Sequence, residues 1–191
     1  RRELFERIPF NTIVDDFVIP LLVKQRTRCR IVYDCGAIAI EETASDVAAE
    51  FSRRARIGAG GYQAIGMLWR LLDPRRGWIS FTFLSHKILR WLCPFALLGM
   101  VACNVLLLSH PLFRLTFVIQ AIFYSFSFLM MCLPPRLDRV RLLRLAPLFT
   151  AMNLALLLGF WRWLRGKQGG TWQRTNRAGM SGEAVAHVAS V

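Results

Sequence analysis

Residues 91–133 read WLCPFALLGMVACNVLLLSHPLFRLTFVIQAIFYSFSFLMMCL, and Arg114 is the only formally charged residue among them. The run is too long for one buried helix, and a His-Pro pair interrupts it. Its two halves, 91–108 and 115–133, are each about as long as a helix needs to cross ~30 Å of hydrocarbon at ~1.5 Å per residue. The run therefore predicts two transmembrane helices joined by a tight turn, with the Arg114 side chain reaching the headgroups.

A third apolar run, residues 145–160, lies between Arg144 and Arg162. It is shorter, so it spans the bilayer if both arginines reach the headgroups, or it re-enters on the same side. Tryptophans at or just outside the ends of the three runs match the aromatic belts of membrane proteins. These are Trp69, Trp78, Trp91, Trp161 and Trp163. We expect two to three transmembrane helices within residues 88–165.

The composition excludes several classes of protein. The chain has 191 residues, of which 54% are hydrophobic, and a net charge of +13. So much apolar content excludes a disordered basic tail and a histone-like binder, and nucleic acid is not an expected partner. The five cysteines include no CxxC pair, which excludes a zinc ribbon and a small disulfide-stapled domain.

The charges divide the chain into a water-facing and a lipid-facing part. Residues 1–87 hold 14 Lys/Arg and 10 Asp/Glu, whereas residues 88–165 hold eight Arg and one acid. The arginine-rich loop at 136–144 is predicted to be cytosolic. Crossing back over the helical hairpin places residues 1–87 in the cytosol, in a multi-pass protein of the cell (inner or plasma) membrane. The basic residues after 162 favour a cytosolic tail as well, which three full spans cannot satisfy, so the side of the tail stays open.

The water-facing part carries a strand-like pattern. Three short runs rich in β-branched, aromatic or apolar residues predict strands: 17–19, 31–33 and 37–40. A capping box, Thr43-x-x-Asp46, then opens a helix to about residue 57. Because three elements cannot bury a core alone, residues 1–60 are predicted to be the closing part of a larger α/β domain. The expected fold class is therefore α/β plus all-α membrane.

Residues 58–87 are predicted to connect this domain to the membrane. The glycines at 58–61 match neither a P-loop nor a dinucleotide fingerprint, so we expect a hinge there. Residues 61–87 then predict an interfacial amphipathic helix that ends in the turn Pro74-Arg75-Arg76-Gly77. At the other end of the chain, residues 166–191 are predicted to be a basic, flexible tail.

Two acidic pairs and one arginine cluster are candidates for chemistry. The pairs are Asp15-Asp16 and Glu41-Glu42, and such a pair is most often a turn or the start of a helix. The cluster is Arg53-Arg54-Ala55-Arg56. A carboxylate beside arginines suits group transfer from a phosphorylated donor, because the carboxylate removes a proton from the attacking hydroxyl. The arginines then hold the diphosphate leaving group. The three histidines are isolated, so no metal site is expected from them.

Several longer motifs carry a resemblance to a known family. They are RELFERIPFNTIVDDFVIP at 2–20, EETA at 41–44, EFSRRARIGAGGYQA at 50–64, FLSHKILRWLCPF at 83–95 and GTWQRTNR at 170–177. Together they resemble the acceptor-side half of membrane-integrated family-2 glycosyltransferases, which include cellulose, hyaluronan and poly-N-acetylglucosamine synthases. The resemblance covers about residues 1–177.

The resemblance implies a GT-A fold, whose truncated end would be residues 1–60, and a nucleotide-sugar donor. It also implies a divalent metal, Mg or Mn, with ligands expected before residue 1, so that this chain alone would be inactive. It places Asp16 at the catalytic base, with Asp15 where the family has Glu. Arg53, Arg54 and Arg56 would bind the donor diphosphate or the acceptor. Ile57 stands where processive members have a Trp that stacks on the acceptor sugar, so a glycan and a lipid acceptor both stay open.

Two other classes of function remain. A non-enzymatic membrane adaptor, whose basic face binds anionic lipids, would explain the net charge and the tryptophan positions. A transporter subunit would need polar residues within the spans, for which Asn104 and Asn153 are the candidates.

Overall fold

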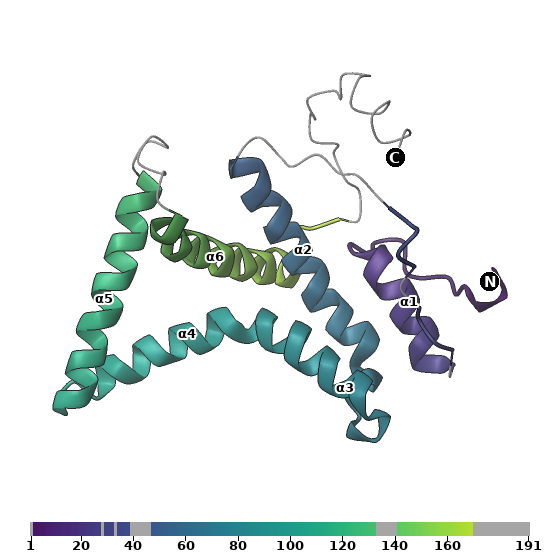
Figure 1. Ribbon diagram of the computed structural model, residues 1–191, viewed down its shortest axis with the longest axis horizontal. Coiled ribbons are helices and arrows are strands. Elements are labelled where there is room, and N and C mark those ends of the chain that lie inside the picture. Colours follow the sequence, from purple (N-terminus) through teal and green to yellow (C-terminus); the bar gives the residue numbers. More distant parts are fainter. Residues whose placement is uncertain (1, 28, 33, 39–46, 133–140, 170–191) are drawn as a thin grey trace, which may run out of the picture.

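The computed structural model describes the chain except for residues 1, 28, 33, 39–46, 133–140 and 170–191. Most of the described residues lie in helices, which are joined by turns and by longer non-helical segments such as residues 5–14 (Figure 1). In chain order these are η1 (Arg2–Leu4), α1 (Asp15–Arg26), α2 (Val47–Leu68), η2 (Trp69–Leu72), η3 (Pro74–Arg76), α3 (Trp78–Phe83), η4 (Leu84–Ile88), α4 (Leu89–Leu106), α5 (Pro111–Cys132), η6 (Arg141–Arg144) and α6 (Leu145–Leu164). Of these, η4 is a single π-helical turn.

The predicted α/β class, and with it the end of a GT-A domain, is wrong: no strand occurs in the described part of the chain. The predicted strand at 17–19 lies within α1. Asp15 and Asp16 put two negative charges in the first turn of α1, where they stabilise the helix dipole. The strand preference of 17–19 spans only about 1 kcal/mol per residue and depends on a neighbouring strand to pair with. The acidic pair is thus a helix start.

The other predicted strands fare no better where the structure describes them. Residues 31, 32, 37 and 38 belong to no strand. Tyr33, residues 39–40 and the capping box at 43–46 lie outside the described residues.

The predicted hinge at 58–61 is also wrong, because α2 runs unbroken through its glycines. These glycines allow other segments to approach the helix closely. A Cβ atom on Gly60 would lie 2.8 Å from a methyl carbon of Val14, and one on Gly61 would lie 2.4 Å from the Trp91 ring. Their role is therefore in packing rather than in bending.

Within the described residues, three helical stretches are long and apolar enough to cross a membrane: Trp78–Leu106, Pro111–Cys132 and Leu145–Leu164. The first begins well before the predicted residue 91, because α3 and η4 continue directly into α4. The predicted tight turn lies between α4 and α5, where Pro111 opens α5 at the position that proline favours. Arg114 Nε donates to the Leu108 carbonyl at 3.4 Å and so fastens this turn.

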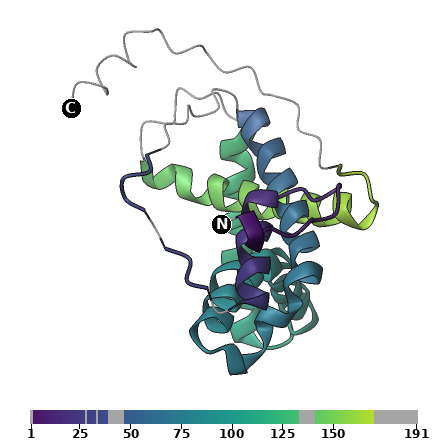
Figure 2. The same ribbon diagram turned by 90° about the vertical axis from the view of Figure 1, so that its right-hand side faces the viewer.

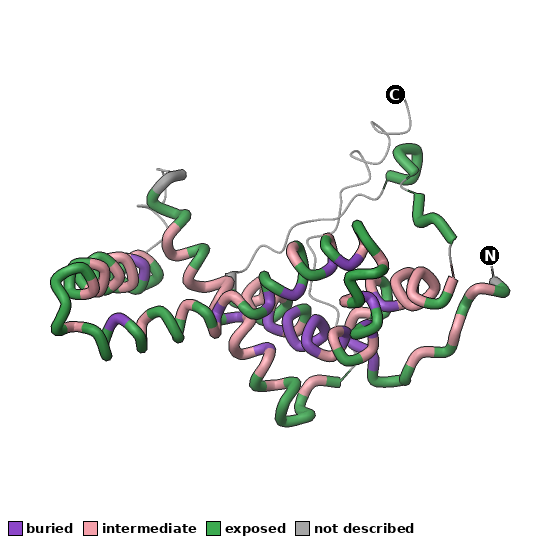
Figure 3. The backbone as a smooth tube through the Cα atoms, turned by 90° about the horizontal axis from the view of Figure 1, so that it is seen from below, coloured by how far each residue is buried: buried purple, intermediate pink, exposed green. Residues whose placement is uncertain are grey.

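Two regions of the helical assembly differ in how they pack. α5 stands apart from α1 and α2, while α4 and α6 converge on α2 (Figure 1). We call α1, α2, η2, residues 78–96 and residues 155–164 the inner cluster, and residues 97–132 with 145–154 the outer arm. Buried residues concentrate in the inner cluster (Figure 3). Its core consists of Val18, Tyr62, Ala64, Leu68, Leu71, Phe83, Ile88 and Trp91.

The contact between α2 and α6 is the most extensive between two described helices. It is close because Gly159 faces the α2 backbone: a Cβ atom there would lie 2.4 Å from the Ala55 oxygen and 2.8 Å from the Ala59 nitrogen. Nearby, the Tyr62 and Phe160 rings meet edge to face with centroids 5.1 Å apart. α6 is therefore fixed to α2 over its second half.

The outer arm is joined instead by polar side chains. Asn104 of α4 donates to Gln120 Oε1 of α5 at 2.8 Å and accepts from the Thr116 hydroxyl at 3.1 Å. Ser127 of α5 and Thr150 of α6 share a hydrogen bond of 2.8 Å. Such bonds link helices in hydrocarbon, where apolar side chains gain nothing from leaving lipid.

Candidate active site

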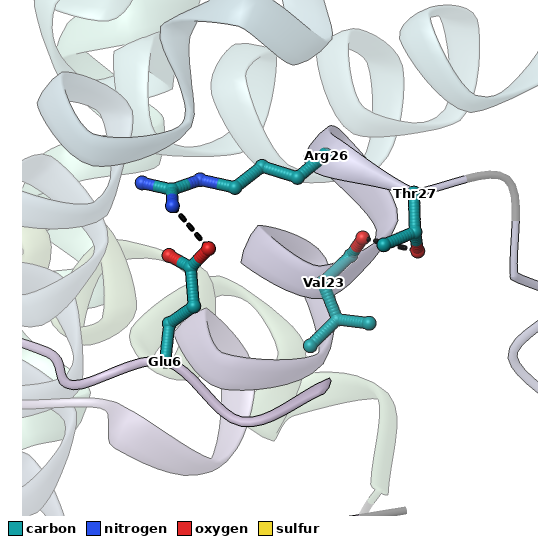
Figure 4. Close-up of polar contacts among 4 residues, drawn as sticks. All are labelled: Glu6, Val23, Arg26 and Thr27. Carbon is teal, nitrogen blue, oxygen red and sulfur yellow. Dashed lines mark hydrogen bonds and ion pairs between the residues drawn. The ribbon is translucent and has the colours of Figure 1, made fainter. Parts of the chain in front are cut away.

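The position of α1 is set by contacts on both sides of it. The Gln63 side chain on α2 accepts from the Ile13 amide and donates to the Asn11 carbonyl, both at 3.0 Å. At the far end of α1, Arg26 forms an ion pair with Glu6, and the Thr27 hydroxyl donates to the Val23 carbonyl at 2.7 Å (Figure 4). Seen from the side, α1 lies alongside α2 (Figure 2). The amino end of α1 is thus fastened to α2.

Asp15 and Asp16 lie at this end and are both exposed. Asp15 Oδ1 accepts from the Asp16 amide at 3.0 Å, and Asp16 Oδ1 accepts from the Phe17 amide at 2.9 Å. Asp16 is among the residues that line the cavity beside the start of α1, and Asp15 is not. The second oxygen of Asp16 forms no hydrogen bond with the described residues, so it can meet a ligand.

The cavity beside Asp16 has a volume of about 480 Å³ and walls from four parts of the chain. It lies where the start of α1, α2, the η4–α4 junction and α6 meet. Its lining residues are Val14, Asp16, Phe17, Arg54, Ile57, Gly61, Lys87, Arg90, Trp91, Met152 and Leu156. We call it the charged cavity, because one acid and three cations line it.

Arg54 reaches the charged cavity from α2 and is held on two sides. Its Nε lies 2.6 Å from Glu50 Oε1, one helical turn earlier, and its Nη1 lies 3.6 Å from the Met152 sulfur on α6. Ile57 and Gly61 follow at i+3 and i+7, so all three lie on one face of α2. Arg54 is therefore positioned before any ligand binds.

Lys87 and Arg90 reach the cavity from the junction of η4 and α4. Lys87 Nζ lies 4.6 Å from the centre of the Phe17 ring, within the range of a cation–π contact. Trp91 also lines the cavity, but it is only 7% exposed and meets Phe17 edge to face. Its indole thus forms a wall rather than a free stacking surface.

Burial also fixes Trp91 from behind. The Tyr62 hydroxyl on α2 donates to the Trp91 carbonyl at 2.5 Å. Desolvation by burial raises the pKa of Tyr62 to about 12, so this hydroxyl keeps its proton across the physiological range. The hydrogen bond therefore holds α4 against α2 at all ordinary pH values.

The charges that line the charged cavity favour the binding of an anion next to a carboxylate that can act as a base. Arg54, Lys87 and Arg90 carry three positive charges, against the negative charge of Asp16 in the lining and that of Glu50, which pairs with Arg54. Arginine and lysine donate charge-assisted hydrogen bonds to phosphate oxygens. Throughout the described residues, no cluster of three or more His, Cys, Asp or Glu side chains could hold a metal ion. The donors present do not fit the implied divalent metal, and we assign no step to one here.

The structure brings some of the predicted site residues together and leaves others apart. Asp16 and Arg54 line the same cavity, although 38 positions separate them. Asp15, Arg53 and Arg56 are not among its lining residues. Arg53 Nη1 instead lies 3.5 Å from Glu50 Oε2, and Arg56 is half-buried on α2.

Sequence reasoning assigned no role to Lys87 and Arg90, and treated Trp91 only as the end of a span. The signal was present in their spacing, since positions i, i+3 and i+4 share one face of a helix. What the sequence could not show is that this face meets the start of α1.

Comparison with known protein families, curated proteins and solved structures finds no match to this chain.

Proposed function

We propose that this chain is the acceptor-side and membrane part of a glycosyltransferase, which moves a sugar from a nucleotide-sugar donor to a glycan or lipid acceptor. One observation carries the proposal: Asp16 shares a cavity with Arg54, Lys87 and Arg90. A base beside several cations is what transfer to a hydroxyl from a diphosphate donor requires. The nucleoside and any divalent metal would be bound by residues other than those described.

In the proposed step, the acceptor hydroxyl attacks the anomeric carbon of the donor sugar. The new carbon–oxygen bond forms as the bond from that carbon to the diphosphate breaks, and the hydroxyl proton passes to the Asp16 carboxylate. The electron pair of the broken bond stays on the diphosphate oxygen. Arg54, Lys87 and Arg90 stabilise the added negative charge.

The position of the charged cavity along the chain supports a site at the membrane surface. Lys87 and Arg90 are the last charges before the apolar part of the first candidate span. Trp69 in η2 and Trp78 at the first position of this span are 62% and 76% exposed, as headgroup-level tryptophans are. The proposal places residues 1–87 on the cytosolic side of the cell membrane.

The test is Asp16→Asn in the protein as its gene encodes it, with Asp15→Asn as the matched control. Membranes are supplied with radiolabelled nucleoside diphosphate sugars, and the label transferred to any product is counted. Asp16→Asn should lower transfer about 10²–10⁴-fold, the range for losing a general base. Asp15→Asn should leave transfer nearly unchanged, because Asn can still accept from the Asp16 amide.

Equal transfer by wild type and Asp16→Asn, with both inserted in the membrane, would refute the role of Asp16. No transfer by wild type from any donor would refute the enzyme itself. The adaptor function would then gain ground, since Arg70 lies 5.7 Å from the exposed Trp69 ring, a pair suited to anionic headgroups. That function predicts vesicle binding that falls steeply with salt.

A further inference from the structure

A second cavity lies deeper along the same helices. It has a volume of about 250 Å³, and α4, α5 and α6 all contribute to its wall. Leu97, Val101, Tyr124, Phe149 and Leu157 are among its lining residues. All three helices are candidate membrane spans. We call it the apolar cavity.

The wall of the apolar cavity is almost entirely carbon. Three lining residues carry a polar side chain, Tyr124, Thr150 and Asn153, and the last two are hydrogen-bonded within the protein. The Thr150 hydroxyl shares a hydrogen bond with Ser127, and Asn153 Nδ2 donates to the Phe149 carbonyl of its own helix at 2.9 Å. A ligand in this cavity is therefore held by hydrocarbon contacts.

Two helices, α4 and α6, contribute residues to both the apolar cavity and the charged cavity. On α4, Trp91 lines the charged cavity, and Pro94, less than one turn further on, lines the apolar cavity. On α6, Leu156 lines the charged cavity, and the next residue, Leu157, lines the apolar one. At ~1.5 Å rise per residue, the lining positions on each helix are only about 2–5 Å apart along its axis. One molecule with a polar head and an apolar chain can reach both.

We propose that the acceptor is a membrane lipid whose hydroxyl-bearing head lies beside Asp16 and whose hydrocarbon chain occupies the apolar cavity. This inference rests on the proposed glycosyl transfer and names its acceptor class. A hydrocarbon chain is favoured as the occupant because the cavity wall is almost entirely carbon and the three helices that form it are candidate membrane spans.

The hydrocarbon chain of the lipid contributes more to its position in the protein than to its affinity. A hydrocarbon chain that moves from the bilayer into the apolar cavity exchanges one apolar medium for another, so there is little hydrophobic gain. What the cavity supplies is a fixed depth for the head relative to the Asp16 carboxylate. Filling the cavity should therefore impair transfer to lipid without unfolding the protein.

The test is Val101→Phe, which fills the cavity, with Val105→Phe as the matched control. Val105 lies one turn further along α4, is 46% exposed and does not line the cavity. Leu157→Phe fills the same cavity from α6 and serves if Val101→Phe does not fold. Each variant is reconstituted in vesicles made from the total lipid extract of its host membranes. Radiolabel from the nucleotide-sugar donor is then divided into chloroform-extractable product and the remainder.

We expect wild-type label in the chloroform-extractable product, a loss on the order of tenfold in Val101→Phe or Leu157→Phe, and no loss in Val105→Phe. Thermal unfolding in detergent establishes that each variant compared is folded. Label found only in a water-soluble or insoluble polymer would overturn the lipid acceptor while leaving the proposed transfer intact. Extractable product that neither folded filling variant reduces would overturn the role of the cavity. No label in any product would instead overturn the proposed function.

Discussion

The inner cluster buries carbon, whereas the buried residues of the outer arm are polar. Within residues 97–132 and 145–154, all of which the structure describes, only Asn104 and Ser127 are buried. The inner cluster instead buries residues such as Val18, Leu68 and Leu71 completely. The difference follows from the solvent: water drives apolar groups together, but lipid does not, so helices in lipid associate through close backbone contact and hydrogen bonds.

The α2–α6 contact lies between the region that packs as in water and the region that packs as in lipid. α6 is apolar enough to span a membrane, yet its second half packs against the charged helix α2. Small residues make this possible, since Ala155 and Gly159 present no side chain beyond a methyl group. Four variants would break or sharpen the contrast between the two regions.

Gly159→Ala should have the largest effect. The new methyl group would meet the Ala55 oxygen at 2.4 Å and the Ala59 nitrogen at 2.8 Å, and both are backbone atoms that cannot rotate away. Overpacking of this kind costs about 1–3 kcal/mol, and backbone contact places the expected loss at about 3. Thermal unfolding in detergent, followed by circular dichroism, measures it.

Gly99→Ala on α4 is the matched control for Gly159→Ala, because nothing lies within 4 Å of its Cβ position. It should leave stability unchanged or slightly raised, since alanine favours helix over glycine by up to about 1 kcal/mol. Equal effects at both glycines would contradict the close α2–α6 contact.

Asn104→Leu should come next. It removes two hydrogen bonds between α4 and α5, to Gln120 and Thr116. Hydrogen bonds between membrane helices contribute about 0.6 kcal/mol on average and at most about 1.7, so we expect a loss of about 1–2 kcal/mol. The measurement is the same unfolding transition. A stabilised variant would show that the outer arm, like the inner cluster, is held by carbon contacts.

Ser127→Ala should have a smaller effect than Asn104→Leu. It removes the single hydrogen bond to Thr150, for which the average of about 0.6 kcal/mol applies. The double variant with Thr150→Val tests the pair, because both polar groups are then absent. If the double variant loses more stability than the two single variants lose together, the hydrogen bond is not the source of the effect.

The effect of Tyr62→Phe should depend on pH. In the folded state burial raises the pKa of Tyr62 from 10.0 to about 12, so folding favours the protonated hydroxyl. This contribution is fully present below pH 10 and is lost as pH rises through about 12. The difference in melting temperature between wild type and Tyr62→Phe should thus be constant from pH 7 to 9 and shrink by pH 11. A difference that grows above pH 10 would contradict the sign.

The sequence predicted the membrane part of this fold better than the water-facing part. Residues 91–133 could be interpreted because composition alone specifies helices in lipid, where every backbone group must be satisfied within the segment. The first helical stretch starts earlier than the predicted span because it continues through Lys87 and Arg90 and through a polar segment before them, in which Thr82 and Ser85 donate to carbonyls of their own helix. These hydroxyl groups are satisfied by hydrogen bonds to the backbone, which the sequence pattern does not show.

The wrong predictions for the water-facing part of the chain have one cause in common. The runs 17–19 and 58–61 were interpreted from local preference, toward a strand and a hinge, but their conformations are set by partners distant in sequence. Gly60 packs closely against Val14, and Gly61 packs closely against Trp91. For the same reason Asp16 and Arg54 could be named as candidates, while the cavity that joins them to Lys87 could not.

The union of α2 with α6 has a consequence for the whole protein in its bilayer. Since Arg54 is carried by α2, and Asp16 is fastened to α2 through Gln63, both follow α6 as one unit. The 20 residues of α6 extend about 30 Å at ~1.5 Å per residue, close to the thickness of the hydrocarbon layer. A thinner bilayer is accommodated by tilting such a helix, which shifts everything attached to it. If α6 spans the bilayer, lipid thickness therefore sets the depth of the charged cavity, whose wall includes Met152 and Leu156 near the middle of α6.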